Sequence, residues 1–203
     1  MNTIIAKALF NSHSYFEYKK IISDLLLESK STGPLQSEEL TLYSSLNTTR
    51  MNRLDKTITI SNENISVLKD LKKDYLWIVI SEGWCGDAAQ LLPIFDKMAA
   101  ESNKNIEMKI VLRDENEALM NLFLTNKTKS IPKLIIIDKA NGLFLDHWGP
   151  RPKAASDLIK EYKEKVGVVD ENAKTELQLW YLHDKGTSTQ NEITAIMKAL
   201  DEQ

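Results

Sequence analysis

The stretch YLWIVISEGWCGDAAQLLPIF, residues 75–95, decides how this chain of 203 residues folds. It opens with an unbroken apolar run, residues 75–80, which is typical of a strand buried on both faces. Gly-Trp-Cys-Gly then leads into a helix-like segment, so Cys85, the only cysteine, stands at a helix N-terminus. The unpaired backbone N–H groups and the positive end of the helix dipole favour the thiolate there, which is the reactive form of the side chain.

Composition and charge exclude several classes of protein. The apolar fraction of 42% and the charged fraction of 27% are ordinary for a globular chain, and the formal net charge of −3 gives no basis for binding nucleic acid or an anionic membrane. No apolar run is long enough to span a membrane. A single cysteine excludes an intramolecular disulfide, which fits a reducing compartment. We therefore expect a cytoplasmic protein with neither nucleic acid nor membrane as partner; the oligomeric state stays open.

The first part of the chain, residues 1–55, has helical patterns. Ser14 and Glu17 have the spacing of a capping box before an apolar stripe at helical spacing. Ser31-Thr32-Gly33-Pro34 ends that helix, and a second one is predicted to start at Ser37. We expect residues 1–55 to form a helical N-terminal extension.

The middle of the chain, residues 56–166, alternates strand and helix patterns. Lys139-Ala140-Asn141-Gly142 is the turn signal of a hairpin. The order predicts an α/β sandwich with a mixed sheet, in which parallel crossovers come first and a hairpin last. The expected strands are 56–61, 75–80, 106–112, 134–137 and 143–147; the expected helices are 62–71, capped by Asn62, then 85–102, 117–124 and one from Pro152 to Val166.

The last part, residues 167–203, is predicted to add two helices packed on the same domain. One runs from about Asp170 to Lys185 and stops at Gly186. The other is capped by Thr189, with Glu192 at capping-box spacing.

The residues around the thiol resemble the thioredoxin family, whose Trp-Cys-Gly-Pro-Cys motif lies between a buried strand and a helix. Trp84-Cys85-Gly86 matches the first half of that motif, Pro93 matches the proline inside the active-site helix, and Pro132 matches the cis-proline that faces the thiol. The longer wording, residues 82–88, resembles a bacterial branch of thioredoxin-like proteins. The resemblance covers about residues 56–166 and implies a thioredoxin-like three-layer sandwich with helical N- and C-terminal extensions.

The sequence departs from the family pattern where the second half of the reaction takes place. Ala88 replaces the second cysteine, Asp87 replaces the intervening proline, and Val79 replaces the buried acid that accepts the second thiol's proton. Without a second thiol, the chain is not a two-cysteine disulfide reductase.

A lone thiol can attack a disulfide to form a mixed disulfide, or be oxidised to a sulfenic acid, and an external thiol must complete either cycle. A low-molecular-weight thiol is then the co-substrate, and we expect no other cofactor. Asp87, with Glu82 beside it, repels a thiolate at Cys85, so we predict a thiol less acidic than that of a thioredoxin. Asp87 has two interpretations: an acid that stabilises the helix start, or a hydrogen-bonding or general-base carboxylate.

The resemblance also implies a substrate groove beside the thiol. Ile131 would offer its backbone to an extended peptide next to Pro132. Trp84 is either a wall of this groove or part of the core. The groove residues are Trp84, Gly86, Asp87, Ile131 and Pro132, with Glu82, Ala88, Arg113 and Asp114 behind them.

Arg113 and Asp114 end a predicted strand at the edge that carries the thiol helix. Arg113 either stabilises a thiolate or a bound carboxylate, or forms a surface pair with Asp114. His147, Trp148 and Arg151 follow the last strand and are weaker candidates for the same groove. His13 and His183 lie on predicted helical segments without metal-ligand partners, so we expect no metal site.

Two main functions remain open from the sequence. The first is a monothiol redox protein that meets a protein or small-thiol disulfide through Cys85. The second is a binding module of the thioredoxin fold that holds a peptide or partner protein, with Cys85 incidental. A third is transfer chemistry of the thiol on a small electrophile.

Overall fold

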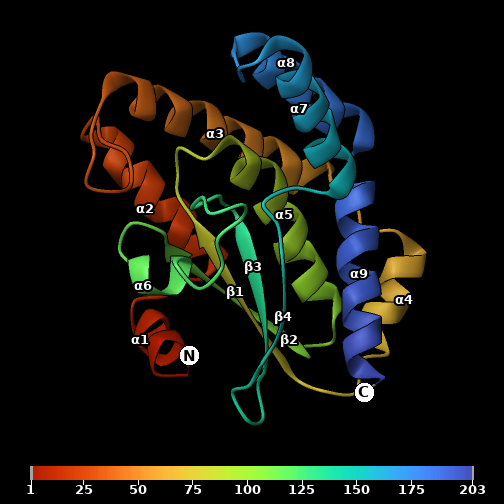
Figure 1. The fold of residues 1–203 in the computed structure, drawn as a ribbon. Helices are drawn as coiled ribbons and strands as arrows, with labels where there is room; N and C mark the ends of the chain where they lie inside the picture. The colour runs from red at the N-terminus through yellow and green to blue at the C-terminus, as the bar shows by residue number, and fades with distance from the viewer. Residues whose placement is uncertain (1, 203) are drawn as a thin grey trace.

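The computed structural model describes residues 2–202 and shows helices covering a mixed β-sheet (Figure 1). Within those residues the sheet has four strands: β1 (Tyr75–Ser81), β2 (Ile106–Leu112), β3 (Lys133–Asp138) and β4 (Phe144–Trp148). The strand order is β2-β1-β3-β4; β1 and β2 are parallel, whereas β3 is antiparallel to both of its neighbours. The predicted α/β sandwich, with a parallel crossover first and a hairpin last, is confirmed.

The strand β1 is sealed on both faces, as its unbroken apolar sequence predicted. Trp77, Ile78, Val79 and Ile80 are all 0% exposed. Full burial of each such side chain stabilises the fold by about 1.5–3 kcal/mol. Because β1 is paired on both edges, its C-terminal end is a rigid platform for the residues that follow it.

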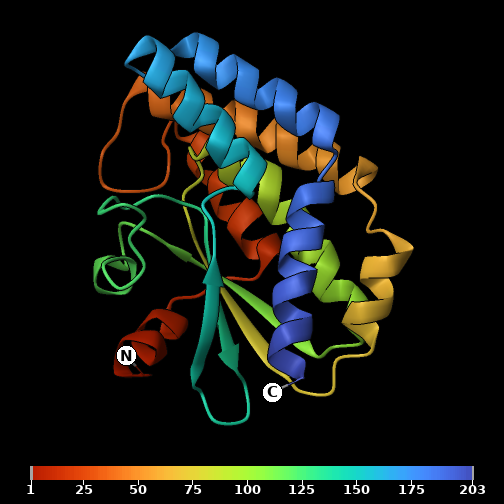
Figure 2. The same ribbon diagram turned by 45° about the vertical axis from the view of Figure 1, so that its right-hand side comes forward.

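Helices pack on both sides of this sheet. The helix α5 (Gly86–Glu101) follows β1 and packs against α4 (Asn62–Lys69) and α9 (Thr187–Asp201). Figure 2 shows these three helices together on one side of the sheet, with α1 (Asn2–Phe10) and α6 (Glu117–Met120) on the other.

The N-terminal part forms the predicted helices α2 (Tyr15–Leu27) and α3 (Glu38–Thr57). The capping box forms: the Glu17 amide donates to Ser14 Oγ at 3.2 Å, and the Ser14 amide donates to Glu17 Oε2 at 2.7 Å. Ser37 caps α3 by accepting from the Leu40 amide at 3.2 Å. The helix α3 then packs along α5 (Figure 1).

The predicted strand at 56–61 is wrong, because α3 continues to Thr57 and the next residues join no sheet. Ile58 and Ile60 are buried, which explains the alternating pattern. The backbone of this segment pairs with side chains instead of a neighbouring strand: Lys97 donates to the Ile58 carbonyl, and Gln190 Nε2 donates to the Thr59 carbonyl at 3.1 Å.

Several smaller predictions also need correction. The helix predicted at 117–124 ends at Met120. Ser61, not Asn62, caps α4. His13 lies in an extended link that bridges to Ile110 of β2, not in a helix. Thr189 is buried inside α9 and does not cap it. The predicted capping box does not form, and the Glu192 carboxylate instead accepts from Trp148 Nε1 and the Lys153 amide, both at 2.8 Å.

Between β4 and α9 the chain forms a helical hairpin of α7 (Lys153–Val166) and α8 (Glu171–Asp184). Gly167 ends α7 with a left-handed φ of 90°, which lets the chain turn back at once. The two helices pack on each other. In Figures 1 and 2 the hairpin lies beside α3, at the end of the molecule where α5 begins.

Candidate functional site

Cys85 lies at the junction of β1 and α5, as the sequence predicted. Its backbone is extended, with φ −77° and ψ 112°, and its side chain occupies the N-cap position of α5. The Ala88 amide approaches Cys85 Sγ at 3.5 Å, and the thiol donates to the carbonyl of Ile131 at 3.3 Å. Only 8% of the cysteine is exposed. The thiol is therefore at the expected helix start but is closed off from solvent.

The residues facing the thiol come from the loop before β3. The peptide bond between Ile131 and Pro132 is cis, and both residues are buried. Gly149 closes the far side of this loop: a Cβ there would lie 2.5 Å from the Pro132 carbonyl oxygen. Pro93, the other proline of the resemblance, is inside α5.

Asp87 lies in the first turn of α5 but is only 8% exposed, and both of its oxygens have partners. Arg151 Nη2 contacts Oδ2 at 2.6 Å, and the Tyr181 hydroxyl donates to Oδ1 at 2.9 Å. The carboxylate thus starts the helix and also joins α5 to the α7–α8 hairpin. Both interpretations considered from the sequence were incomplete, because they treated Asp87 without its distant partners.

The environment of Cys85 keeps its thiol protonated. Burial is the largest cause that raises the pKa of Cys85 to about 12, and the negative charge of Asp87 raises it further. The amides of Ala88 and Asp87 and the guanidinium of Arg151 act in the opposite direction and are weaker. The direction agrees with the expectation of a weakly acidic thiol, but burial, which the sequence did not reveal, is the main reason.

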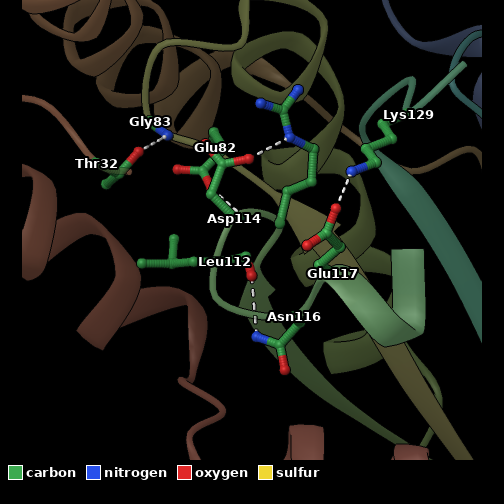
Figure 3. A network of polar contacts seen from close by, with 9 residues as sticks. Thr32, Glu82, Gly83, Leu112, Asp114, Asn116, Glu117 and Lys129 are labelled. Atoms are coloured by element: carbon green, nitrogen blue, oxygen red, sulfur yellow. Dashed lines mark hydrogen bonds and ion pairs between the residues drawn. The ribbon is translucent and has the colours of Figure 1, made fainter. Parts of the chain in front are cut away.

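A second group of polar side chains lies where β1 and β2 end (Figure 3). Glu82 is 0% exposed, and its Oε1 accepts from the Asp114 amide at 2.9 Å. Asp114 Oδ1 lies 2.7 Å from Arg113 Nε, so the predicted Arg–Asp pair is present. The Arg113 guanidinium also lies 4.7 Å from the centroid of the Trp84 ring. Trp84 is half-buried under this guanidinium, and Arg113 points to the tryptophan instead of the thiol.

The turn before the cysteine is held by the N-terminal part of the chain, through the loop between α2 and α3 and through α3 itself. The Gly83 amide donates to Thr32 Oγ1 at 2.8 Å (Figure 3), and Asn47 Nδ2 donates to the Gly83 carbonyl at 2.9 Å. A Cβ on Gly83 would lie 2.9 Å from Ile22 Cγ1, so the close approach requires glycine. The N-terminal extension thus forms one wall of the site.

The structure separates the three remaining candidates: His147 and Trp148 lie at the end of β4, and Arg151 follows it. Arg151 reaches the thiol region through Asp87. The His147 ring packs 5.6 Å from the ring of Phe123, and Trp148 bonds to Glu192, so these two side chains serve other contacts.

The described part of the chain contains no cluster of side chains suited to bind a metal ion. Among residues 2–202, no group of three or more His, Cys, Asp or Glu side chains is placed to hold a metal ion. A membrane span is likewise not found: over the same residues, none of the helices is both long enough and apolar enough for a crossing.

The sequence did not indicate four residues that shape the site: Thr32, Asn47, Gln178 and Tyr181. Gln178 Oε1 accepts from Gln90 Nε2 at 2.6 Å, and Tyr181 is 94 residues away from Asp87 in the chain. Neutral polar side chains on amphipathic helices give no local signal for such contacts.

A thiol at the start of the helix that follows a buried strand, facing the residue before a proline, defines a thiol-bearing α/β fold of the thioredoxin type. The chain matches the sequence model of the Thioredoxin family over residues 33–163, more than half of its length. The chain belongs to the thioredoxin family. The match includes α3 as well as the sheet.

Solved structures of the same fold also match. One is a protein of unknown function, PA1234 from Pseudomonas aeruginosa, with a TM-score of 0.58 at 17% identity over 92% of this chain and 98% of that chain. Another is an HIV epitope-scaffold, 4E10, with a TM-score of 0.57 at 18% identity over 92% of this chain and 99% of that one. At such identities the likeness shows the fold alone. A search of curated proteins found no significant match.

Proposed function

We propose that the protein is a monothiol redox protein of the cytoplasm, in which Cys85 forms a mixed disulfide with a substrate disulfide, or a sulfenic acid when a peroxide oxidises it, and external thiols reduce either product. The observation that carries the proposal is the placement of the single thiol. Cys85 Sγ lies at the N-terminus of α5, within 3.3 Å of the carbonyl before Pro132, and Ala88 stands where a second thiol would be needed.

The disulfide reaction takes two exchange steps. The Cys85 thiolate attacks one sulfur of a protein or small-thiol disulfide, forming a new S–S bond while the other sulfur leaves as a thiolate and takes up a proton. A low-molecular-weight thiolate then attacks the mixed disulfide and restores Cys85. For Cys85 to leave as a thiolate, the external thiolate must attack the other sulfur of the mixed disulfide. Each S–S bond that breaks is then replaced by a new one, so one sulfur of the original disulfide ends as a thiol and the external thiol ends in a new disulfide.

The closed site sets a condition on this chemistry. Cys85 is 8% exposed, and burial together with Asp87 raises the pKa of Cys85 to about 12, so little thiolate forms at neutral pH. Attack requires a state in which the sulfur meets solvent and its pKa falls towards the ordinary value of about 8.5.

The experiment is turnover of a glutathione mixed disulfide on a model peptide, with excess reduced glutathione, by wild type and Cys85→Ser. We expect turnover by the wild type only, together with a glutathione adduct on Cys85 by mass spectrometry. Equal rates for the two proteins would refute the redox proposal.

A second candidate is a thioredoxin-fold binding module for a peptide or partner protein. The specific observation in its favour is that the thiol, whose pKa is raised, donates a hydrogen bond to the Ile131 carbonyl, so Cys85 already has a structural partner. A partner captured equally by wild type and Cys85→Ser, without disulfide turnover, would support this second function.

A further inference from the structure

The hairpin α7–α8 is placed over the start of α5, and its contacts converge on the thiol's own helical turn. Arg151, just before α7, and Tyr181, in α8, both bind the carboxylate of Asp87, two residues after Cys85. Gln178 of α8 accepts from Gln90, one turn further along α5. A Cβ on Gly86 would lie 3.9 Å from Gln178 Nε2. The hairpin and the residue before it therefore lie against the first turns of α5, near enough for Arg151 and Tyr181 to interact electrostatically with Cys85.

These contacts are largely polar. In addition to the Asp87 and Gln90 contacts, Lys174 of α8 donates to the Tyr43 hydroxyl of α3 at 3.1 Å. The buried apolar side chains of the hairpin are few: Ala155 in α7, and Ala173, Leu177 and Tyr181 in α8. Val166, Val168 and Val169, at the tip of the hairpin, are 50%, 59% and 43% exposed. A unit whose helices pack mainly on each other can separate from its neighbours as a local event.

The closed arrangement also leaves one buried donor unused. Arg151 Nε is buried and, among the residues that the structure describes, has no hydrogen-bond partner. Such a group loses its water without gaining a bond, which offsets part of the stabilisation from the Arg151–Asp87 ion pair. The unused donor is therefore a cost of the closed arrangement that an open arrangement, with Arg151 in solvent, would not carry.

We propose that the α7–α8 hairpin is a lid over Cys85, that Asp87 with Arg151 and Tyr181 is its latch, and that disulfides reach the thiol only when the latch opens. The inference rests on the proposed function, because it assigns the step that admits the disulfide to the buried thiol. Tyr181 is a positioning residue here, since it acts on Cys85 through Asp87.

The test uses Ellman's reagent, an aromatic disulfide, which reports on Cys85 alone because the chain has one cysteine. Tyr181→Phe removes one hydrogen bond to the latch carboxylate. The matched control is Tyr15→Phe: Tyr15 is buried, donates to Asp55 at 2.9 Å, and Asp55 also has a cationic partner, Lys19. We expect Tyr181→Phe to react about tenfold faster than wild type, as for a lost hydrogen bond to a charged group, and Tyr15→Phe within about twofold. Equal rates for the two variants would overturn the lid.

The same reaction followed in low urea separates lid opening from global unfolding. Opening the hairpin exposes a small part of the buried surface, so the rate for wild type should rise only weakly with urea. A slope as steep as that of global unfolding would overturn the lid. Gln178→Ala, which removes the Gln90 contact, tests the same prediction if Tyr181→Phe does not fold.

The two proposals fail in different ways. Faster reaction of Tyr181→Phe with Ellman's reagent, without glutathione turnover in any variant, leaves the lid and refutes the redox function. Glutathione turnover by the wild type, with Tyr181→Phe no faster than Tyr15→Phe, leaves the redox function and refutes the lid.

Discussion

Asp87 is the residue at which the charges of the site meet. It raises the pKa of Cys85, and its carboxylate accepts hydrogen bonds from Arg151 and Tyr181, which follow the last strand of the sheet in the chain. A carboxylate in the first turn of a helix stabilises the helix through its interaction with the helix dipole, but its negative charge repels a nearby thiolate. One side chain thus joins the hairpin to α5 and adds to the rise in the pKa of the buried thiol.

We expect Asp87→Asn to lower the pKa of Cys85 by about one pH unit or more, because a like charge is removed while the Arg151 guanidinium remains. The measurement is the rate of iodoacetamide alkylation as a function of pH. Asp96→Asn, on the same helix but outside the latch, is the control. An unchanged pH profile in Asp87→Asn would mean that burial alone determines the pKa of the thiol.

Glu82 is the other acid beside the cysteine, and burial raises its pKa above the ordinary 4.5. The folded protein therefore holds this proton more tightly than the unfolded chain does. The resulting stabilisation is complete below pH 4.5 and is lost as the pH rises through the raised pKa.

The Glu82→Gln variant has no carboxyl group to ionise here, so it should not lose this stabilisation. Its free energy of unfolding, compared with that of the wild type, should therefore rise between pH 4.5 and neutrality. Urea unfolding at several pH values measures the difference. Glu115→Gln, at an exposed position, should show a constant difference from wild type. A constant difference for Glu82→Gln as well would contradict the linkage.

At the scale of elements, the helix α3 is part of the site and not only a structural extension. Asn47 is 0% exposed, donates to the Gly83 carbonyl at 2.9 Å and accepts from Arg50 Nη1 at 2.8 Å. It therefore fixes the turn that carries Trp84 and Cys85. The site thus joins α3 and α5, two helices that the sequence assigned to different parts of the chain.

Asn47→Ala should reduce the free energy of unfolding by about 2 kcal/mol, because the buried Gly83 carbonyl loses its donor. Asn52→Ala, exposed on the same helix, should change it by less than about 0.5 kcal/mol. Chemical denaturation of both variants gives the comparison. Similar losses in the two would show that the Asn47 bond does not stabilise the turn.

At the scale of the whole molecule, the thiol is closed by three distant parts of the chain. The loop before β3 binds the sulfur, the N-terminal helices hold Gly83, and the α7–α8 hairpin holds Asp87. Closure of the site is thus a property of the complete fold.

Cys85 in the folded protein should react with Ellman's reagent at least about 100-fold more slowly at pH 7.5 than in concentrated urea. Unfolding removes the burial and returns the thiol to a pKa of about 8.5, so the thiolate fraction rises steeply. Rates that differ by less than about tenfold would show that the folded site is open.

The local features were predictable from the sequence because they depend on neighbours in the chain. Patterns within a few residues predict the buried strand β1, the helix start at Cys85 and the capping box of α2. The alternation at 56–61 shows the limit of such patterns: burial of Ile58 and Ile60 was real, but side chains of Lys97 and Gln190 took the place of a neighbouring strand.

The sequence by itself determined that the protein has a thioredoxin fold and one thiol without a partner thiol. Only the tertiary structure decided that this thiol is buried, protonated and covered. The reason is physical: the pKa of a side chain depends on its solvent exposure and on the charges around it. Here burial, the largest cause that raises the pKa of Cys85, comes from the packing of distant parts of the chain, and the guanidinium of Arg151, far from Cys85 in sequence, acts on the thiol against the neighbouring Asp87.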